Sequence, residues 1–132
     1  MSAPASFLAL GDERFVSLTT FRKTGVPVPT TVWIARDGDN LIVTTPKDSG
    51  KVKRLRHNGR VELRPCNRRG AVADGVVSVP GIAVICDDDA TRERQSAVFL
   101  KKLGLEYRIF MFIERRGRSG AKRRVMLKIS AA

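Results

Sequence analysis

Three short strand patterns joined by tight connections limit the folds that this chain can adopt. Residues 15–21, 30–35 and 40–45 are rich in β-branched and aromatic side chains. Asp37-Gly38 supplies the turn between the second and third, where a left-handed backbone is tolerated. Pro27-Val28-Pro29 leads into the second strand, and since proline donates no ladder hydrogen bond, we expect either an edge strand or the entry to a strand there. The pattern predicts consecutive antiparallel strands.

The rest of the chain adds strands and a few helices. Tyr107–Ile113 is ambiguous between helix and strand. The fold class predicted is mainly β (α+β): a small antiparallel β-barrel of six strands with two to three helices, formed by residues 1–132 as a single domain. The further predicted elements are a short helix over 51–59, a strand over 60–66, a long strand over 70–86 bent at Pro80-Gly81, a helix over 90–103 behind three aspartates, and a closing strand over 123–130.

Composition narrows the class of protein. The chain has 132 residues, 42% of them hydrophobic, which is enough for a packed core and argues against disorder. Its two cysteines, Cys66 and Cys86, have no metal-ligand spacing and are too few for a disulfide scaffold. No signal peptide is visible, and the uncharged run 75–86 is shorter than a membrane span. We expect a cytoplasmic protein with no membrane span.

The net charge of +12 lies in two blocks. Residues 47–69 hold nine Lys or Arg against two acids, and residues 108–128 hold eight against one. Such an excess favours a polyanionic partner, and nucleic acid is the first class to consider. However, residues 47–69 contain no Phe, Tyr or Trp on which a base could stack. A basic nucleic-acid-binding domain is therefore kept only as a minor alternative.

The catalytic inventory is nearly empty. His57 is the only histidine, so a Ser-His-Asp or Cys-His relay cannot be assembled, and no catalytic residue is assigned. The aspartates at 87–89 are explained by capping of the following helix, so we predict no metal. Hydrolase chemistry is not expected.

One segment does indicate a binding site. Residues 44–54 run from a strand end through a loop into a helix, and they bring together hydroxyls, backbone N–H groups and cations. This combination suits a phosphate. The same pattern also suits a capped helix with a solvated basic face, and the local sequence leaves both interpretations open. Ser49-Gly50-Lys51 is not a nucleotide P-loop, because the first glycine and the magnesium-binding hydroxyl are missing.

Four segments, in this order and spacing, resemble a known family. They are residues 15–25, 27–33, 49–54 and 64–70. Together they look like the pyridoxamine 5'-phosphate oxidase-like split β-barrel flavoproteins. More narrowly, they resemble the branch of short oxidoreductases that use the deazaflavin coenzyme F-420 in place of FMN. The resemblance covers nearly the whole chain and implies a six-stranded split barrel that forms a homodimer, with a cofactor in each of two clefts at the subunit interface.

The resemblance also implies where the cofactor lies. Trp33 has an alternative interpretation as a core or dimer-interface aromatic. The residues implied near the cofactor ring are Thr30, Thr31, Val32 and Trp33, with Thr44 and Thr45 close by; those matching the phosphate-binding turn are Ser49, Gly50, Lys51 and Arg54, and Lys47 is carried over with them.

In such a family the cofactor carries the chemistry, which agrees with the empty catalytic inventory. The function predicted is hydride transfer from reduced F-420 to an unidentified unsaturated substrate, such as a quinone or a tetrapyrrole. The alternative is an FMN-binding oxidoreductase or flavin carrier of the same fold. Because F-420 bears an oligoglutamate tail, the basic excess favours it over FMN.

Overall fold

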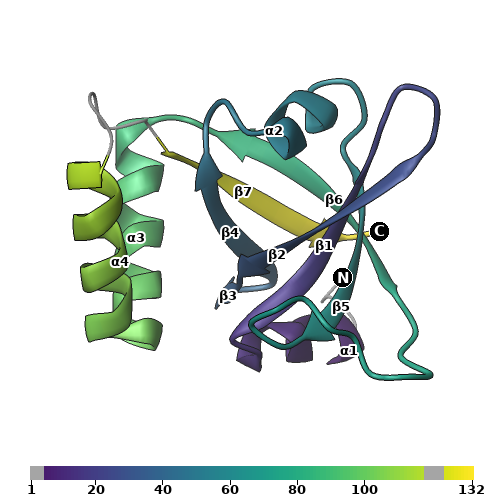
Figure 1. Cartoon of the computed structure of the whole chain (residues 1–132), viewed down its shortest axis with the longest axis horizontal. Helices are drawn as coiled ribbons and strands as arrows, with labels where there is room; N and C mark the ends of the chain where they lie inside the picture. Colours follow the sequence, from purple (N-terminus) through teal and green to yellow (C-terminus); the bar gives the residue numbers. More distant parts are fainter. Residues whose placement is uncertain (1–4, 118–123) are drawn as a thin grey trace.

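The computed structural model describes residues 5–117 and 124–132. It places one antiparallel sheet at the centre and a pair of helices against one side of it (Figure 1). The elements in chain order are α1 (Ala5–Leu8), a 3₁₀ helix η1 (Ala9–Asp12), β1 (Phe15–Phe21), β2 (Pro27–Trp33), β3 (Ala35–Asp37), β4 (Asn40–Pro46), α2 (Gly50–Leu55), β5 (Arg60–Cys66), β6 (Val79–Cys86), α3 (Asp89–Leu103), α4 (Leu105–Gly117) and β7 (Arg124–Ala131).

The sheet curves so that its two edges meet in one segment of chain. The strand order is β2-β1-β5-β6-β7-β4-β3, with antiparallel pairing throughout. β2 pairs with β1 at one edge, and β3 pairs with β4 at the other. Only Ile34 separates β2 from β3, so the segment 27–37 is bound to the sheet on both sides and closes it into a barrel. The predicted antiparallel α+β fold with a β-barrel is confirmed.

The described residues form seven strands rather than the predicted six, because the second predicted strand is divided at Ile34. The Ile34 carbonyl accepts a hydrogen bond from the Lys102 ammonium at 2.6 Å, and this ammonium also binds the carbonyls of Gly11 and Glu13. A carbonyl held by α3 is not available to a neighbouring strand. The ladder with β1 therefore ends at Trp33, and the ladder with β4 begins at Ala35.

The strand boundaries follow local chemistry. β1 spans Phe15–Phe21 as predicted, and β2 includes Pro27 and Pro29 and lies at a sheet edge, which is one of the two geometries expected for these prolines. The prediction of a long strand over 70–86 is wrong for its first half, since β6 begins at Val79. Gly70 and Gly75 have φ of +87° and +80°, a left-handed backbone that interrupts any strand.

Two hydrophobic clusters hold the barrel and the helices together. The first fills the barrel interior and includes Val16, Leu18, Leu63 and Leu127. The second joins the sheet to the helices and consists of Ala35, Ile42, Phe99, Leu103, Tyr107 and Met126. Successive strand residues point to opposite faces, so in β4 and β7 neighbouring residues enter different clusters. Both faces of this part of the sheet are covered.

The helices begin where polar caps are available. The Ser49 hydroxyl accepts from the Val52 N–H at 3.4 Å at the start of α2. The Asp88 carboxylate accepts from the Thr91 N–H at 2.9 Å and caps α3; hydrogen bonding from the Thr91 side chain and then from its backbone lowers the pKa of Asp88. α2 is shorter than the predicted helix over 51–59, because the chain turns after Leu55 to enter β5. The ambiguous stretch after Gly104 is helical and lies beside α3 (Figure 1).

Among the described residues, no helix has the length and hydropathy to cross a membrane. In the same part of the chain, no three His, Cys, Asp or Glu side chains are grouped to hold a metal ion. Cys66 and Cys86 are free thiols, and burial raises the pKa of each.

Candidate functional site

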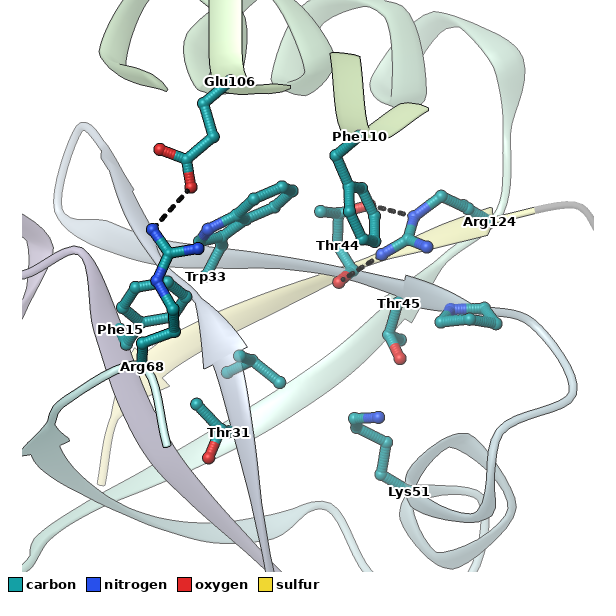
Figure 2. A pocket seen from close by; sticks show the side chains of 12 residues that line it. Phe15, Thr31, Trp33, Thr44, Thr45, Lys51, Arg68, Glu106, Phe110 and Arg124 are labelled. Carbon is teal, nitrogen blue, oxygen red and sulfur yellow. Dashed lines mark hydrogen bonds and ion pairs between the residues drawn. The ribbon is translucent and has the colours of Figure 1, made fainter. Parts of the chain in front are cut away.

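A cavity of about 350 Å³ lies where β2, the end of β4, the start of α2 and α4 approach one another (Figure 2). This volume is within the range of small-molecule sites. Its lining combines aromatic, hydroxyl and charged side chains from segments far apart in the sequence. The lining residues are Phe15, Thr31, Val32, Trp33, Thr44, Thr45, Pro46, Lys51, Arg68, Glu106, Phe110 and Arg124.

Aromatic rings form one wall of the cavity. Trp33 from β2 meets Phe110 from α4 edge to face, with ring centroids 4.7 Å apart. Behind them Tyr107 is buried and stacks on Phe99, which anchors the wall in the helix layer. The Trp33 Nε1 donor is buried and has no acceptor among the described residues. An unpaired buried N–H is costly, so it indicates a place where a ligand supplies an acceptor.

The α2 end of the cavity is cationic. Lys51 is half-buried, and it makes no ion pair with any residue that the structure describes. Burial lowers the pKa of Lys51, and the nearby charges of Arg124 and Arg54 lower it further. Three positive groups in this arrangement form a site for an anion.

Arg124 is held in place by β4. Its Nε donates to the Thr44 hydroxyl at 3.1 Å, and its Nη2 donates to the Thr44 carbonyl at 3.1 Å. Its guanidinium also lies 5.7 Å from the Phe110 ring centroid. These contacts fix a charge beside the aromatic wall at the first residue of β7.

The opposite end of the cavity carries an ion-pair cluster. Arg68, in the loop after β5, donates to the Glu106 carboxylate at 3.3 Å. Arg14, just before β1, pairs with the same carboxylate. Two cations at this end are therefore shared by one acid, whereas Lys51 at the other end has no such acid among the described residues.

Six of the predicted site residues line the cavity: Thr31, Val32, Trp33, Thr44, Thr45 and Lys51. Thr30 points elsewhere, because its hydroxyl donates to the Leu18 carbonyl at 3.4 Å. Lys47 also lies outside the lining and forms an ion pair with Asp87 at 2.9 Å. For both residues a cofactor contact stays a prediction.

The three remaining predicted residues lie immediately behind Thr45 and Lys51. The Ser49 and Thr45 hydroxyls are 3.3 Å apart. The Arg54 Nε donates to the Thr20 hydroxyl at 2.6 Å, and its guanidinium packs over Gly50, where an added Cβ would lie 2.9 Å from Nη1. Burial and the neighbouring Arg22 lower the pKa of Arg54. The predicted phosphate turn is thus gathered in one place, but only Lys51 of it reaches the lining.

Six lining residues were not predicted: Phe15, Pro46, Arg68, Glu106, Phe110 and Arg124. Arg68 and Phe15 fall in segments that carried the family resemblance, but nothing in their local pattern marks a site. Glu106 and Phe110 come from α4, whose ambiguous periodicity concealed its position. Tyr107, on the same helix, does not line the cavity and is buried in the second cluster. In the basic block 108–128, the residues up to Gly117 belong to α4, those from Arg124 belong to β7, and 118–123 lie outside the described residues.

The fold and the cavity define an α+β barrel protein with a cavity lined by aromatic rings and cations. The matching family is pyridoxamine 5'-phosphate oxidase, over residues 5–132. The chain therefore belongs to the pyridoxamine 5'-phosphate oxidase family. A search of curated proteins found no match to this sequence.

Solved structures with the same fold carry different names. An F-420 reductase is 20% identical, with a TM-score of 0.59 and coverage of 98% of this chain and 96% of that one. A heme storage protein of Vibrio cholerae is 14% identical, with a TM-score of 0.68 and coverage of 100% and 92%. A pyridoxamine 5'-phosphate oxidase-related, FMN-binding protein of Nostoc punctiforme is 15% identical, with a TM-score of 0.58 and coverage of 89% and 70%. At these identities the likeness shows the fold alone.

Proposed function

We propose that this protein binds the deazaflavin coenzyme F-420 in the cavity and transfers hydride between it and an unsaturated substrate. The observation that carries the proposal is that one cavity is lined by the aromatic rings of Trp33 and Phe110 and, across from them, by the half-buried Lys51, which has no ion pair among the described residues (Figure 2). This lining matches a ligand that has a planar conjugated ring at one end and a phosphate joined to it by a flexible chain: the ring fits the aromatic side chains and the phosphate fits the lysine. Family membership supports a flavin-type cofactor.

The residues of the ring end fit such a group. Trp33 and Phe110 offer apolar surface to a ring, and Val32 extends it. The unpaired Trp33 Nε1–H is a donor for one of the carbonyl oxygens that a deazaflavin ring carries. Thr31, Thr44 and Thr45 add hydroxyls at the margin of this surface. Thr44 is oriented for this task by Arg124, which binds both its hydroxyl and its carbonyl.

The residues of the cationic end fit a phosphodiester. In the proposed complex the Lys51 ammonium pairs with the phosphate, and Arg124 adds a second charge. Ser49 and Arg54 belong to the same turn and helix as Lys51, where their side chains bind the hydroxyls of Thr45 and Thr20. A bound anion also offsets the mutual repulsion of these cations. Ligand binding therefore removes an electrostatic repulsion that destabilises the folded protein when no ligand is present.

When bound, the reduced deazaflavin supplies the hydride. The chain's own residues orient the ring against the second strand and exclude water from one of its faces. None of the lining residues needs to act as a nucleophile, which agrees with the single histidine lying outside the cavity. FMN is the alternative cofactor. F-420 is favoured because its oligoglutamate tail needs more positive charge than one phosphate, and the sequence carries a net charge of +12.

We further propose a homodimer in which α4 packs against a second copy. Tyr107 and Met111 face the second hydrophobic cluster. On the opposite side of the same helix, Leu105, Ile109, Phe112 and Ile113 are exposed at 69%, 49%, 61% and 61%. A helix that is apolar on two opposite faces needs cover on both. Because α4 also contributes Glu106 and Phe110 to the cavity, a partner on this helix would lie beside the cofactor.

The cofactor proposal is tested by titrating purified protein with F-420 and with FMN, and then following oxidation of the reduced form of the tighter one. Saturable F-420 binding tighter than FMN binding is expected. Tight FMN binding without F-420 binding would replace F-420 by the alternative cofactor. The dimer is tested by sedimentation: Ile109→Glu should give monomers, whereas Val77→Glu, at a loop residue 81% exposed, should not.

A further inference from the structure

The ion-pair cluster of Arg14, Arg68 and Glu106 has no role in the proposed cofactor site, although Arg68 and Glu106 line the same cavity and Arg14 binds Glu106 from outside the lining. The Arg68 side chain is 70% exposed and that of Glu106 31%. Exposed ion pairs contribute only about 0–1 kcal/mol, so this one opens readily. A carboxylate that arrives from outside meets two guanidinium groups held together by a single, weakly bound protein carboxylate.

The turn that presents Arg68 is rigidly constructed. The Asn67 side-chain oxygen accepts from the backbone N–H groups of Arg69 and Ala71, each at 2.9 Å. Gly70 closes the turn with a φ of +87°, and a Cβ there would lie 2.5 Å from the Thr31 hydroxyl. The turn therefore packs tightly on β2. Its position holds the Arg68 guanidinium 5.5 Å from the Phe15 ring centroid at the cavity lining.

The two charged ends of the cavity are separate. In Figure 2, Arg68 and Glu106 lie on one side of Trp33, while Lys51 lies across the cavity. Glu106 is the only carboxylate among the described lining residues. If a cofactor phosphate occupies the Lys51 end, the arginines at the other end remain available for a second anion.

We propose that Arg68 and Arg14 form a carboxylate subsite, and that the substrate is a conjugated acid whose carboxylate displaces Glu106 from Arg68. This inference rests on the proposed function for the chemistry that follows binding. The anchored carboxylate directs the unsaturated part of the substrate toward the aromatic wall and the cofactor ring. Glu106 acts as a placeholder: it keeps the arginines paired until an acid replaces it, and it disfavours neutral molecules that cannot do so.

The test uses two probes of nearly equal shape, trans-cinnamate and cinnamamide, of which only the first is charged. Each is titrated into the protein with and without saturating F-420, and the indole N–H signal is followed by NMR. The chain has one tryptophan, so this signal belongs to Trp33 in the cavity lining. Cinnamate is expected to bind about fivefold more tightly than cinnamamide, as for a charge-assisted hydrogen bond made by a partly exposed guanidinium.

Arg68→Gln should abolish that preference. Arg69→Gln removes the same charge from the adjacent exposed residue, which does not line the cavity, and should retain the preference. Glu106→Gln should tighten cinnamate binding about two- to threefold by removing the competing carboxylate. Equal binding of the two probes, a preference that survives Arg68→Gln, or no binding of either probe would overturn the subsite. F-420 binding is measured in every variant. If the wild-type protein did not bind F-420, the proposed function would be wrong, whereas a preference for cinnamate in the same protein would still support the carboxylate subsite.

Discussion

The two ends of the cavity hold cations in opposite electrostatic states. Lys51 is half-buried and unpaired among the described residues, and its pKa is lowered, whereas Arg68 and Arg14 are more exposed and share Glu106. A buried, uncompensated charge reduces stability, so a protein keeps one only where a ligand pairs with it. The exposed pair carries almost no such cost. The Lys51 end is therefore suited to attract an anion, whereas the Arg68 end is suited to exchange one carboxylate for another.

The largest effect is expected from Lys51→Met, which keeps most of the stem and removes the charge. F-420 affinity should fall between about tenfold and a hundredfold, the range for loss of a charge-assisted hydrogen bond. Lys53→Met, at an exposed position of the same helix, is the matched control and should bind normally. Equal affinities for the two variants, measured by F-420 fluorescence titration, would remove Lys51 from the phosphate site.

The Arg68 end depends on backbone geometry, and Gly70→Ala should reveal it. The new Cβ combines a positive φ with a contact of 2.5 Å to Thr31, so a loss of about 2 kcal/mol in the free energy of unfolding is expected. Gly75→Ala has a similar φ of +80° but no atom within 4 Å of the added Cβ, and should lose about 1 kcal/mol. Urea denaturation measures both. Matching losses would mean that packing of the turn against β2 contributes nothing.

Between the two ends, Phe110→Ala tests the aromatic wall. Loss of an edge-to-face partner for Trp33 and of ring contact should weaken F-420 binding by about 1 kcal/mol, or roughly fivefold. Phe112→Ala, on the exposed face of the same helix, serves as the control. Both variants are measured in the monomeric Ile109→Glu background, where Phe112→Ala should leave F-420 affinity unchanged. If only Phe112→Ala weakened binding there, the ring would have to lie outside this cavity.

The smallest effect concerns stability against pH. The pKa of Lys51 in the folded protein is below its ordinary value of 10.5, so above the folded-state pKa the unfolded chain binds more protons than the folded one. The free energy of unfolding should therefore rise with pH from the lowered pKa up to about 10.5, relative to Lys51→Met. At neutral pH the variant should be more stable by at most about 1 kcal/mol, since the lysine is only partly buried. Thermal unfolding from pH 7 to 11 checks this; parallel pH profiles would contradict it.

What the sequence predicted well was local. β1 follows directly from its β-branched and aromatic pattern, and the edge position of β2 is one of the two geometries that Pro27 and Pro29 allow. The cluster of Thr44, Thr45 and Lys51 was predicted because those residues are close in sequence and their strand leads straight into α2. The division of β2 from β3 was not, because it depends on Lys102, 68 residues away from Ile34.

The other half of the site was missed for the same reason. Glu106 and Arg68 meet 38 residues apart, and only the packing of α4 beside the barrel brings them together. The apolar pattern of 105–113 serves two opposite faces, so it lacks the single stripe that identifies a helix. Residues 70–78 alternate approximately between apolar and polar types, and this pattern predicted a strand. Gly70 and Gly75 have a left-handed backbone, which interrupts the strand and makes the segment a loop.

In the proposed complex a deazaflavin ring lies against Trp33, and the fluorescence of that tryptophan reports on this contact. It is the only tryptophan in the chain, so its emission reports on one place. On titration with F-420, we predict saturable quenching whose midpoint matches the affinity from cofactor fluorescence and moves to higher concentration in Lys51→Met. F-420 binding that leaves the Trp33 emission unchanged would contradict the account.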